Sequence, residues 1–312
     1  MENLIIALNC VMPIFIYMLV GYYAKSRKVV SQEVFSNISR LAFFCLLPFT
    51  MFHNIYTADL SASFSVRMMM YLVTINILVF VIGCAVMFRT VKNGRRRGLY
   101  LQNLYRSNIA VVGVSLAQPL MTAGELAAMC VAIAVLVPIS NAMAIIALEL
   151  CRGTHISPKK LVMSVAKNPL VFGSLTGIVF SLLGLRLPST VETAIAGLAK
   201  TGSVIILVAL GGTFTFTALR KNAKILTLLT AARLVILPAV MITPAIIMGI
   251  RGSDLATILI CFAAPLATAA YSMALVYDSD DELTGQLVVT TSLFCCVTLF
   301  LWIFLFKQLG LF

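Results

Sequence analysis

The sequence predicts an all-α integral membrane protein that crosses the bilayer ten times. Of its 312 residues, 61% are hydrophobic and only 11% are charged, whereas soluble domains carry about 25% charged residues. The hydrophobic residues form blocks of about 20 residues, the length that spans a bilayer as a helix, and the charges lie almost wholly between the blocks. The predicted spans are residues 4–23, 33–56, 66–88, 99–121, 126–150, 168–187, 196–218, 225–249, 254–276 and 284–306.

The Lys and Arg residues between the spans predict the orientation of the chain. With ten spans, the connections on one side of the membrane hold fifteen Lys and Arg residues, and those on the other side hold five. Because basic loops stay in the cytoplasm, we expect a multi-pass protein of the cell membrane (plasma or inner) with both termini outside. The net charge of +12 resides largely in these loops, and no nucleic-acid-binding motif accompanies it, so we expect the lipid bilayer and not a nucleic acid as its partner.

The longest cytoplasmic connection, at residues 151–167, divides the chain into five spans and five spans. Five is an odd number, so the second half must enter the membrane with the opposite orientation. Secondary transporters commonly consist of such inverted repeats. We therefore predict a first five-helix repeat at residues 1–160 and a second, inverted repeat at residues 161–312.

The fourth span contains polar residues and a proline, both of which are unfavourable in hydrocarbon. Asn108 and Ser115 are seven residues apart and share a helical face, and Gln118 and Pro119 follow within one turn. Proline removes a backbone donor and leaves a carbonyl unpaired. Such a break is tolerated in a membrane only where it faces protein or a water-filled cavity, so we expect a break in this helix at Pro119.

The ninth span has a corresponding feature. Pro265 is followed by Thr268, Tyr271 and Ser272, which share one helical face. The fourth and ninth spans are the fourth helix of each half, and paired interrupted helices predict the binding site of a transporter. A single polar residue often packs between helices instead, and a lone proline often only bends a helix. Asn141, in the fifth span, is a further candidate for the site, with helix packing as its alternative.

Four sequence stretches resemble one known family. Asn108 and Gly113 match its Asn-x4-Gly stretch; "VPISNAMAIIALEL" is similar to its fifth helix, "KNPLVFGSLTGIVFSLLGLRLP" to its sixth, and "FAAPLATAAYSMALVYDSDDELTGQLVVTTSL" to its ninth and tenth. In this order and spacing, they resemble the auxin efflux carrier family, which includes bacterial carboxylate permeases and the plant PIN carriers. The chain departs from the family pattern at Ser115, where the family usually has proline, and has Pro119 instead.

The resemblance implies that two broken helices, spans 4 and 9, cross beside the substrate. It implies a scaffold of spans 1, 2, 6 and 7, a moving bundle of spans 3–5 and 8–10, homodimers, and small organic anions as substrates. Amide groups at helix N-termini suit a carboxylate. The predicted substrate-binding residues are Asn108, Gly113, Ser115, Gln118, Asn141, Pro265, Thr268, Tyr271 and Ser272, with helix breaks at Pro119 and Pro265.

The first choice of function is therefore a carrier of small organic anions that works by alternating access, in an elevator-like manner. The alternatives are a sodium-coupled symporter of the bile-acid type and a membrane sensor without transport. An intramembrane enzyme would need facing catalytic pairs, and the spans contain none. The cysteines form no metal-ligand spacing, so we expect no metal and no cofactor, while proton or sodium coupling stays open.

Arg106 lies inside the fourth predicted span, about two turns from its cytoplasmic end. One interpretation is that its side chain extends to the membrane surface. The other is that its charge collects anions at the cytoplasmic entrance.

Overall fold

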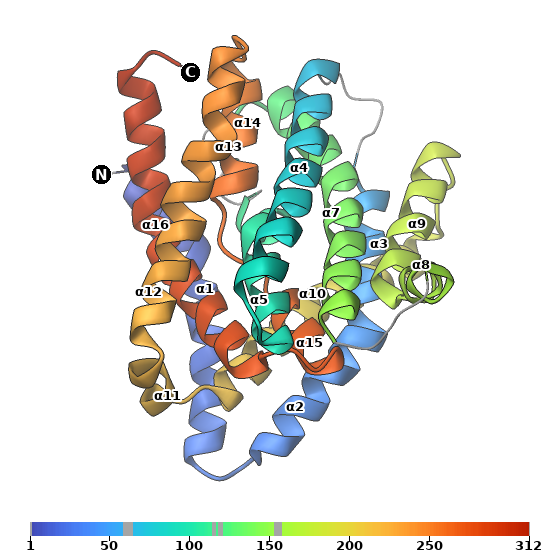
Figure 1. Cartoon of the computed structure of the whole chain (residues 1–312). Helices are drawn as coiled ribbons and strands as arrows, with labels where there is room; N and C mark the ends of the chain where they lie inside the picture. The colour runs from blue at the N-terminus through green and yellow to red at the C-terminus, as the bar shows by residue number, and fades with distance from the viewer. Residues whose placement is uncertain (1, 59–64, 114–116, 118–120, 153–157, 312) are drawn as a thin grey trace.

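The computed structural model describes residues 2–58, 65–113, 117, 121–152 and 158–311. Within these ranges its regular secondary structure is helical, apart from one isolated antiparallel bridge (Figure 1). The predicted all-α class is therefore correct. In the first half, the helices are α1 (Glu2–Ser26), α2 (Gln32–Leu41), η1 (Ala42–Leu46), α3 (Leu47–Tyr56), α4 (Val66–Thr90), α5 (Gly94–Tyr105), η2 (Ile109–Gly113) and α7 (Ala123–Cys151). The second half contains α8 (Pro158–Ala166), α9 (Pro169–Leu182), α10 (Ser189–Thr213), α11 (Phe216–Lys221), α12 (Ala223–Ala231), η3 (Ala232–Ile236), α13 (Leu237–Ile247), α14 (Gly252–Ala263), α15 (Ala269–Val276) and α16 (Asp281–Gln308).

Helices lie at the positions of the predicted spans, but they differ in length. Within the described ranges, five helices are long and apolar enough to cross a membrane, and the bent helix α16 makes a sixth. Two shorter apolar helices are α9 and α14. The five long ones are Gln32–Tyr56, Val66–Thr90, Ala123–Cys151, Ser189–Thr213 and Ala223–Ile247. Several membrane spans are thus evident, while the count of ten and the inversion of the second half stay predictions.

Two of the long helices contain a π-helical segment just before a proline. The segment η1 precedes Pro48, and η3 precedes Pro238. Proline has no N–H, so the carbonyl one turn earlier loses its helical partner. At the second site this carbonyl belongs to Leu234, and the Trp302 indole Nε1 donates to it over 3.0 Å. The second of these segments, η3, also carries a buried arginine, Arg233.

Glycines allow the backbones of one group of helices to touch. A Cβ added at Gly21 would lie 1.8 Å from the Val208 carbonyl oxygen, and one at Gly211 would lie 1.9 Å from the Met18 carbonyl oxygen, so α1 and α10 are in backbone contact. A Cβ at Gly173 would lie 2.3 Å from the Pro48 carbonyl oxygen, which brings α9 against α3. Side chains larger than hydrogen at these positions would force the helices apart.

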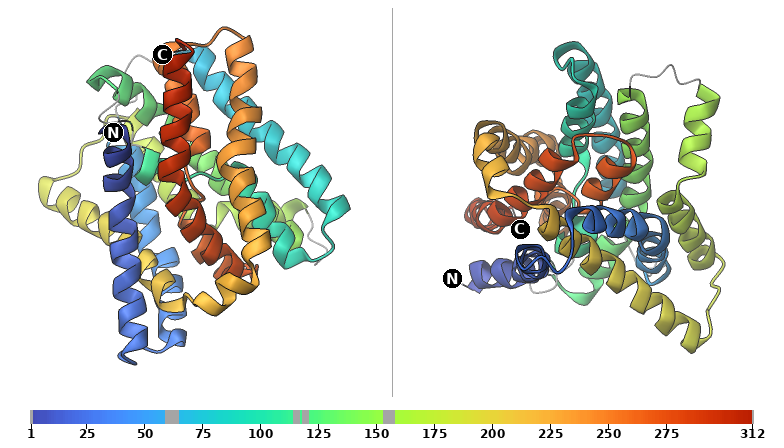
Figure 2. Two further views of the ribbon diagram at one scale, coloured as in Figure 1. Left: turned by 90° about the vertical axis from the view of Figure 1, so that its left-hand side faces the viewer. Right: turned by 90° about the horizontal axis from the view of Figure 1, so that it is seen from below.

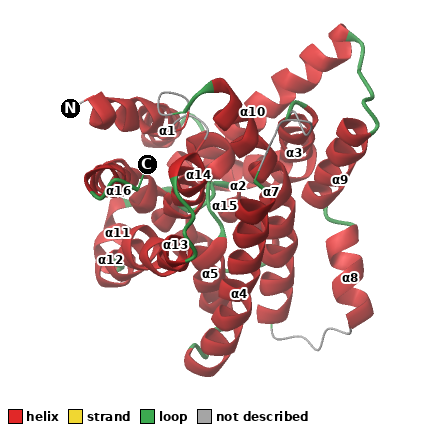
Figure 3. Ribbon diagram, turned by 90° about the horizontal axis from the view of Figure 1, so that it is seen from above, coloured by secondary structure: helices red, strands yellow, loops and turns green. Residues whose placement is uncertain are grey.

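The remaining helices surround the two broken ones. In Figure 2, α16 runs lengthwise between α1 and the α12–α13 helix. Seen from above in Figure 3, α14 and α15 lie in the interior, whereas α8 and α9 lie at one edge. The interior position of the breaks places their unpaired backbone groups inside protein, as a membrane protein requires.

Candidate functional site

The two interrupted helices meet at their breaks. The first break follows Tyr105, and the chain becomes extended at Arg106 before η2 begins. The second break separates α14 from α15 and contains Pro265. The two breaks run antiparallel: the Asn108 amide donates to the Pro265 carbonyl over 2.8 Å, and the Ala267 amide donates to the Arg106 carbonyl over 3.3 Å. Each break therefore satisfies backbone groups that the other leaves unpaired.

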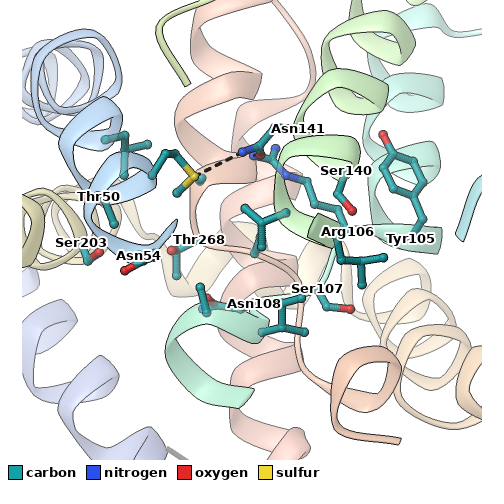
Figure 4. A pocket seen from close by; sticks show the side chains of 18 residues that line it. Thr50, Asn54, Tyr105, Arg106, Ser107, Asn108, Ser140, Asn141, Ser203 and Thr268 are labelled. Atoms are coloured by element: carbon teal, nitrogen blue, oxygen red, sulfur yellow. Dashed lines mark hydrogen bonds between the residues drawn. The ribbon is translucent and has the colours of Figure 1, made fainter. Parts of the chain in front are cut away.

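A cavity of about 60 Å³ lies beside this crossing. Helices α3, α7 and α10 complete its wall, and Figure 4 shows their polar side chains around it. The residues at the start of η2 and at the start of α15 both line it, so two helix N-termini meet the same space. The polar residues of the wall are Thr50, Asn54, Tyr105, Arg106, Ser107, Asn108, Ser140, Asn141, Ser203 and Thr268.

Arg106 brings a positive charge to the cavity. The residue is 2% exposed, and its guanidinium donates to Gln102 Oε1 over 2.6 Å and to Asn141 Oδ1 over 2.9 Å. In the described part of the chain, no carboxylate forms an ion pair with it. One interpretation of the sequence was that Arg106 extends to the membrane surface. The structure contradicts it, because the residue is buried. The helix ends immediately before Arg106, and its guanidinium is held against α7.

Asn108 places an unused donor at the same cavity. The residue is 6% exposed, and its side-chain Nδ2 finds no acceptor among the described residues. Its backbone is fully used, since its amide binds the other break and its carbonyl accepts from the Val112 amide over 3.1 Å. A buried amide without an acceptor is costly. It is the kind of group that a bound ligand can satisfy.

The structure brings together three of the predicted site residues, Asn108, Asn141 and Thr268, on the cavity wall. Pro265 lies in the second break and contributes its carbonyl to the crossing. Asn141 also donates through Nδ2 to the Met51 sulfur over 3.3 Å, the contact that is dashed in Figure 4. It therefore links α7 to α3 as well as holding Arg106.

Three predicted residues lie elsewhere. Gly113 is buried near the side chains of Ile260 and Met129, outside the cavity wall. The Tyr271 hydroxyl lies 2.8 Å from Thr213 Oγ1, facing α10 and lining a different cavity. Ser272 is fully buried, and its hydroxyl has no partner in the described part. Ser115, Gln118 and Pro119 are outside the described residues, so a break at Pro119 stays a prediction.

Sequence reasoning missed several groups at the site. Neither interpretation of Arg106, extension to the membrane surface or collection of anions at the cytoplasmic entrance, placed it at the crossing, and Arg233 was given no role. A charged residue inside an apolar span is costly, and this cost alone could have marked both arginines as candidates. Thr50, Asn54 and Ser203 belong to helices without any break at these positions. Polar residues of this kind are common between membrane helices, so no sequence pattern singles them out.

Comparison with known proteins gives the family. The family described as "Membrane transport protein" matches residues 6–157 and again residues 153–303. The chain is also 25% identical over 299 residues to an uncharacterized transporter of Methanothermobacter thermautotrophicus, covering 94% of this chain and 96% of that protein. Together with the helical architecture, these matches make the chain a multi-pass membrane protein. It belongs to this family of membrane transport proteins, the auxin efflux carrier family that its motifs resemble.

Proposed function

We propose that the protein is a secondary transporter that moves a small, carboxylate-bearing organic anion across the membrane by alternating access. The observation that carries this proposal is the buried guanidinium of Arg106, which shares a cavity with the unused amide donor of Asn108. A guanidinium is always charged, and burying it without a counter-ion is costly. A carboxylate in the cavity would remove this cost and accept hydrogen bonds from both residues.

The backbone adds to the positive field of the cavity. Ile109 and Ala110 at the start of η2, and Thr268 and Ala269 at the start of α15, line its wall. Aligned peptide dipoles give the N-terminal end of a helix a positive partial charge. Two such ends with Arg106 favour an anion.

The size of the cavity limits the ligand. The cavity of about 60 Å³ is several times larger than the roughly 10–15 Å³ that a single bound water needs. This size favours a short mono- or dicarboxylic acid over a large amphipathic acid.

The placement of the cavity supports an elevator-like mechanism. It lies between α3 and α10, which belong to the predicted scaffold, and the crossing and α7, which belong to the predicted moving bundle. The scaffold helices are locked together by backbone contact at their glycines. At the cavity the two groups meet through side chains, among them the hydrogen bond from Asn141 to Met51. Ten spans, two inverted repeats, a homodimer and a cell-membrane location with both termini outside are parts of this proposal.

Uptake by the purified protein in liposomes tests the function. Radiolabelled butyrate and succinate are supplied outside, with sodium or choline in the medium, and with or without a pH gradient. We expect saturable uptake of at least one acid above that of protein-free liposomes. The comparison of sodium with choline, and of media with and without a pH gradient, identifies the coupling ion and tests the sodium-coupled alternative. A monodisperse, thermally stable protein that neither takes up nor binds either acid would contradict the proposal.

A further inference from the structure

Arg233 is a second fully buried arginine, and the cavity does not include it. It lies in the π-helical segment η3, between α12 and α13, and is 0% exposed. In the described part of the chain, it has no carboxylate partner. A charge in this position needs a physical reason, because an uncompensated buried cation is costly.

The guanidinium of Arg233 binds both breaks of the crossing at once. Its Nη1 donates to the carbonyls of Asn103, over 3.1 Å, and Leu104, over 3.3 Å, in the last turn of α5. Its Nε and Nη2 donate to the carbonyl of Ala264, which caps α14, over 3.2 and 3.0 Å. Its Nη2 also donates to the Ser107 hydroxyl. One planar group thus joins the ends of two helices that are far apart in sequence.

The carbonyl ends of the two helices replace a carboxylate as the counter-charge of Arg233. The C-terminal end of a helix has a negative partial charge of about half an elementary charge. Two such ends, those of α5 and α14, together offer about one negative charge, which matches the single positive charge of the guanidinium. The fork geometry of arginine allows this pairing. A lysine has the charge but cannot reach the carbonyls of both helices with a planar fork.

This pairing determines which charges of the crossing remain available to a ligand. A crossing of broken helices presents both amide ends, which favour anions, and carbonyl ends, which in other transporters coordinate sodium. Here Asn103, Leu104 and Ala264 already use their carbonyls to bind Arg233. The amide ends face the cavity together with Arg106.

We propose that Arg233 is a positioning residue that acts as a built-in cation. It holds the two breaks in register and occupies the carbonyls that a sodium ion would otherwise use. The positive side of the crossing, which includes Arg106, is then left to an anion. Its effect on the ligand rests on the proposed function, whereas its effect on the register of the breaks does not.

Hydrogen–deuterium exchange, followed by mass spectrometry, tests the register without any ligand. Arg233→Met removes all hydrogen-bond donors of the side chain and keeps a long, unbranched side chain. Arg233→Lys is the milder variant and is used if Arg233→Met does not fold. We expect the backbone amides of segments 105–108 and 265–268 to exchange at least about tenfold faster in either folded variant. The reason is that Arg233 no longer holds in place the hydrogen bonds from Asn108 to Pro265 and from Ala267 to Arg106. Arg251→Lys is the matched control, since exposed Arg251 donates to the carbonyls of Ile246 and Ile250, away from the crossing.

The second readout is the half-saturation concentration for succinate in counterflow. We expect it to rise about tenfold or more in Arg233→Lys and to stay within about twofold in Arg251→Lys. In the exchange experiment, an unchanged exchange rate in both segments, or an equal rise in exchange rate throughout α12–α14, would overturn the positioning role. In the transport experiment, an unchanged half-saturation concentration together with a lower melting temperature would overturn it. If the wild-type protein does not bind succinate, that failure bears on the proposed function, and the exchange experiment still decides the role of Arg233.

Discussion

Arg106 makes the strongest prediction at the scale of single residues. Arg106→Gln removes the charge from the cavity while keeping a polar side chain near Gln102 and Asn141. Losing a hydrogen bond to a charged group costs about 1.5–3 kcal/mol, so we expect the affinity for an organic anion to fall about ten- to a hundredfold. The half-saturation concentration for acid uptake measures this. Arg220→Gln, at an exposed position, is the control, and equal losses in both variants would remove Arg106 from the site.

Asn108 makes a second prediction at this scale, because its side-chain Nδ2 has no acceptor among the described residues. Asn108→Ala should weaken binding about ten- to a hundredfold, while the melting temperature stays near that of the wild type. If Asn108 served instead as a packing contact between helices, its loss would lower the melting temperature and spare binding. Affinity and melting temperature measured on one purified sample separate the two roles, and a destabilised variant with normal affinity would refute the prediction.

At the scale of helices, Pro265 keeps the second break open. Alanine at this position would regain an N–H that can bond to the carbonyl of Cys261 one turn earlier and extend α14. Such an extension would displace the strand-like pairing between Asn108 and Pro265. We expect Pro265→Ala to slow turnover about tenfold, about 1.4 kcal/mol in the barrier, and initial uptake rates at saturating acid measure it. The control is the same substitution at Pro244, which lies inside α13 and outside the cavity wall. An unchanged uptake rate in Pro265→Ala would contradict the claim that Pro265 keeps the second break open.

The sequence predicts elements better than it predicts their breaks, and the two broken helices show why. The second break contains Pro265, as the loss of a backbone donor suggests. The described break of the first helix is at Arg106–Asn108, where the chain has no proline. It is held open by pairing with residues 265–267 and by Arg233. These contacts join residues more than a hundred positions apart, and local periodicity contains no information about them.

At the scale of the whole molecule, the basic connections predict the orientation in the membrane. The start of α1 and the end of α16 lie toward the same end of the molecule (Figures 1 and 2). Arg96, in the first turn of α5, forms an exposed ion pair with Asp280. A cysteine placed at Arg96 in a cysteine-depleted protein should react with a membrane-impermeant reagent only after the cells are opened. Labelling of that cysteine in intact cells would show that the predicted topology is wrong.

The central claim is that the cavity at the crossing selects a carboxylate by its charge. Competition in proteoliposomes tests this most directly, because succinate and succinamide have similar size and differ in charge. We expect unlabelled succinate to inhibit uptake of labelled succinate at least about tenfold more strongly than succinamide does, since only the anion pairs with the Arg106 guanidinium. This difference should shrink in Arg106→Gln. Equal inhibition by the acid and the amide in the wild-type protein would contradict the claim.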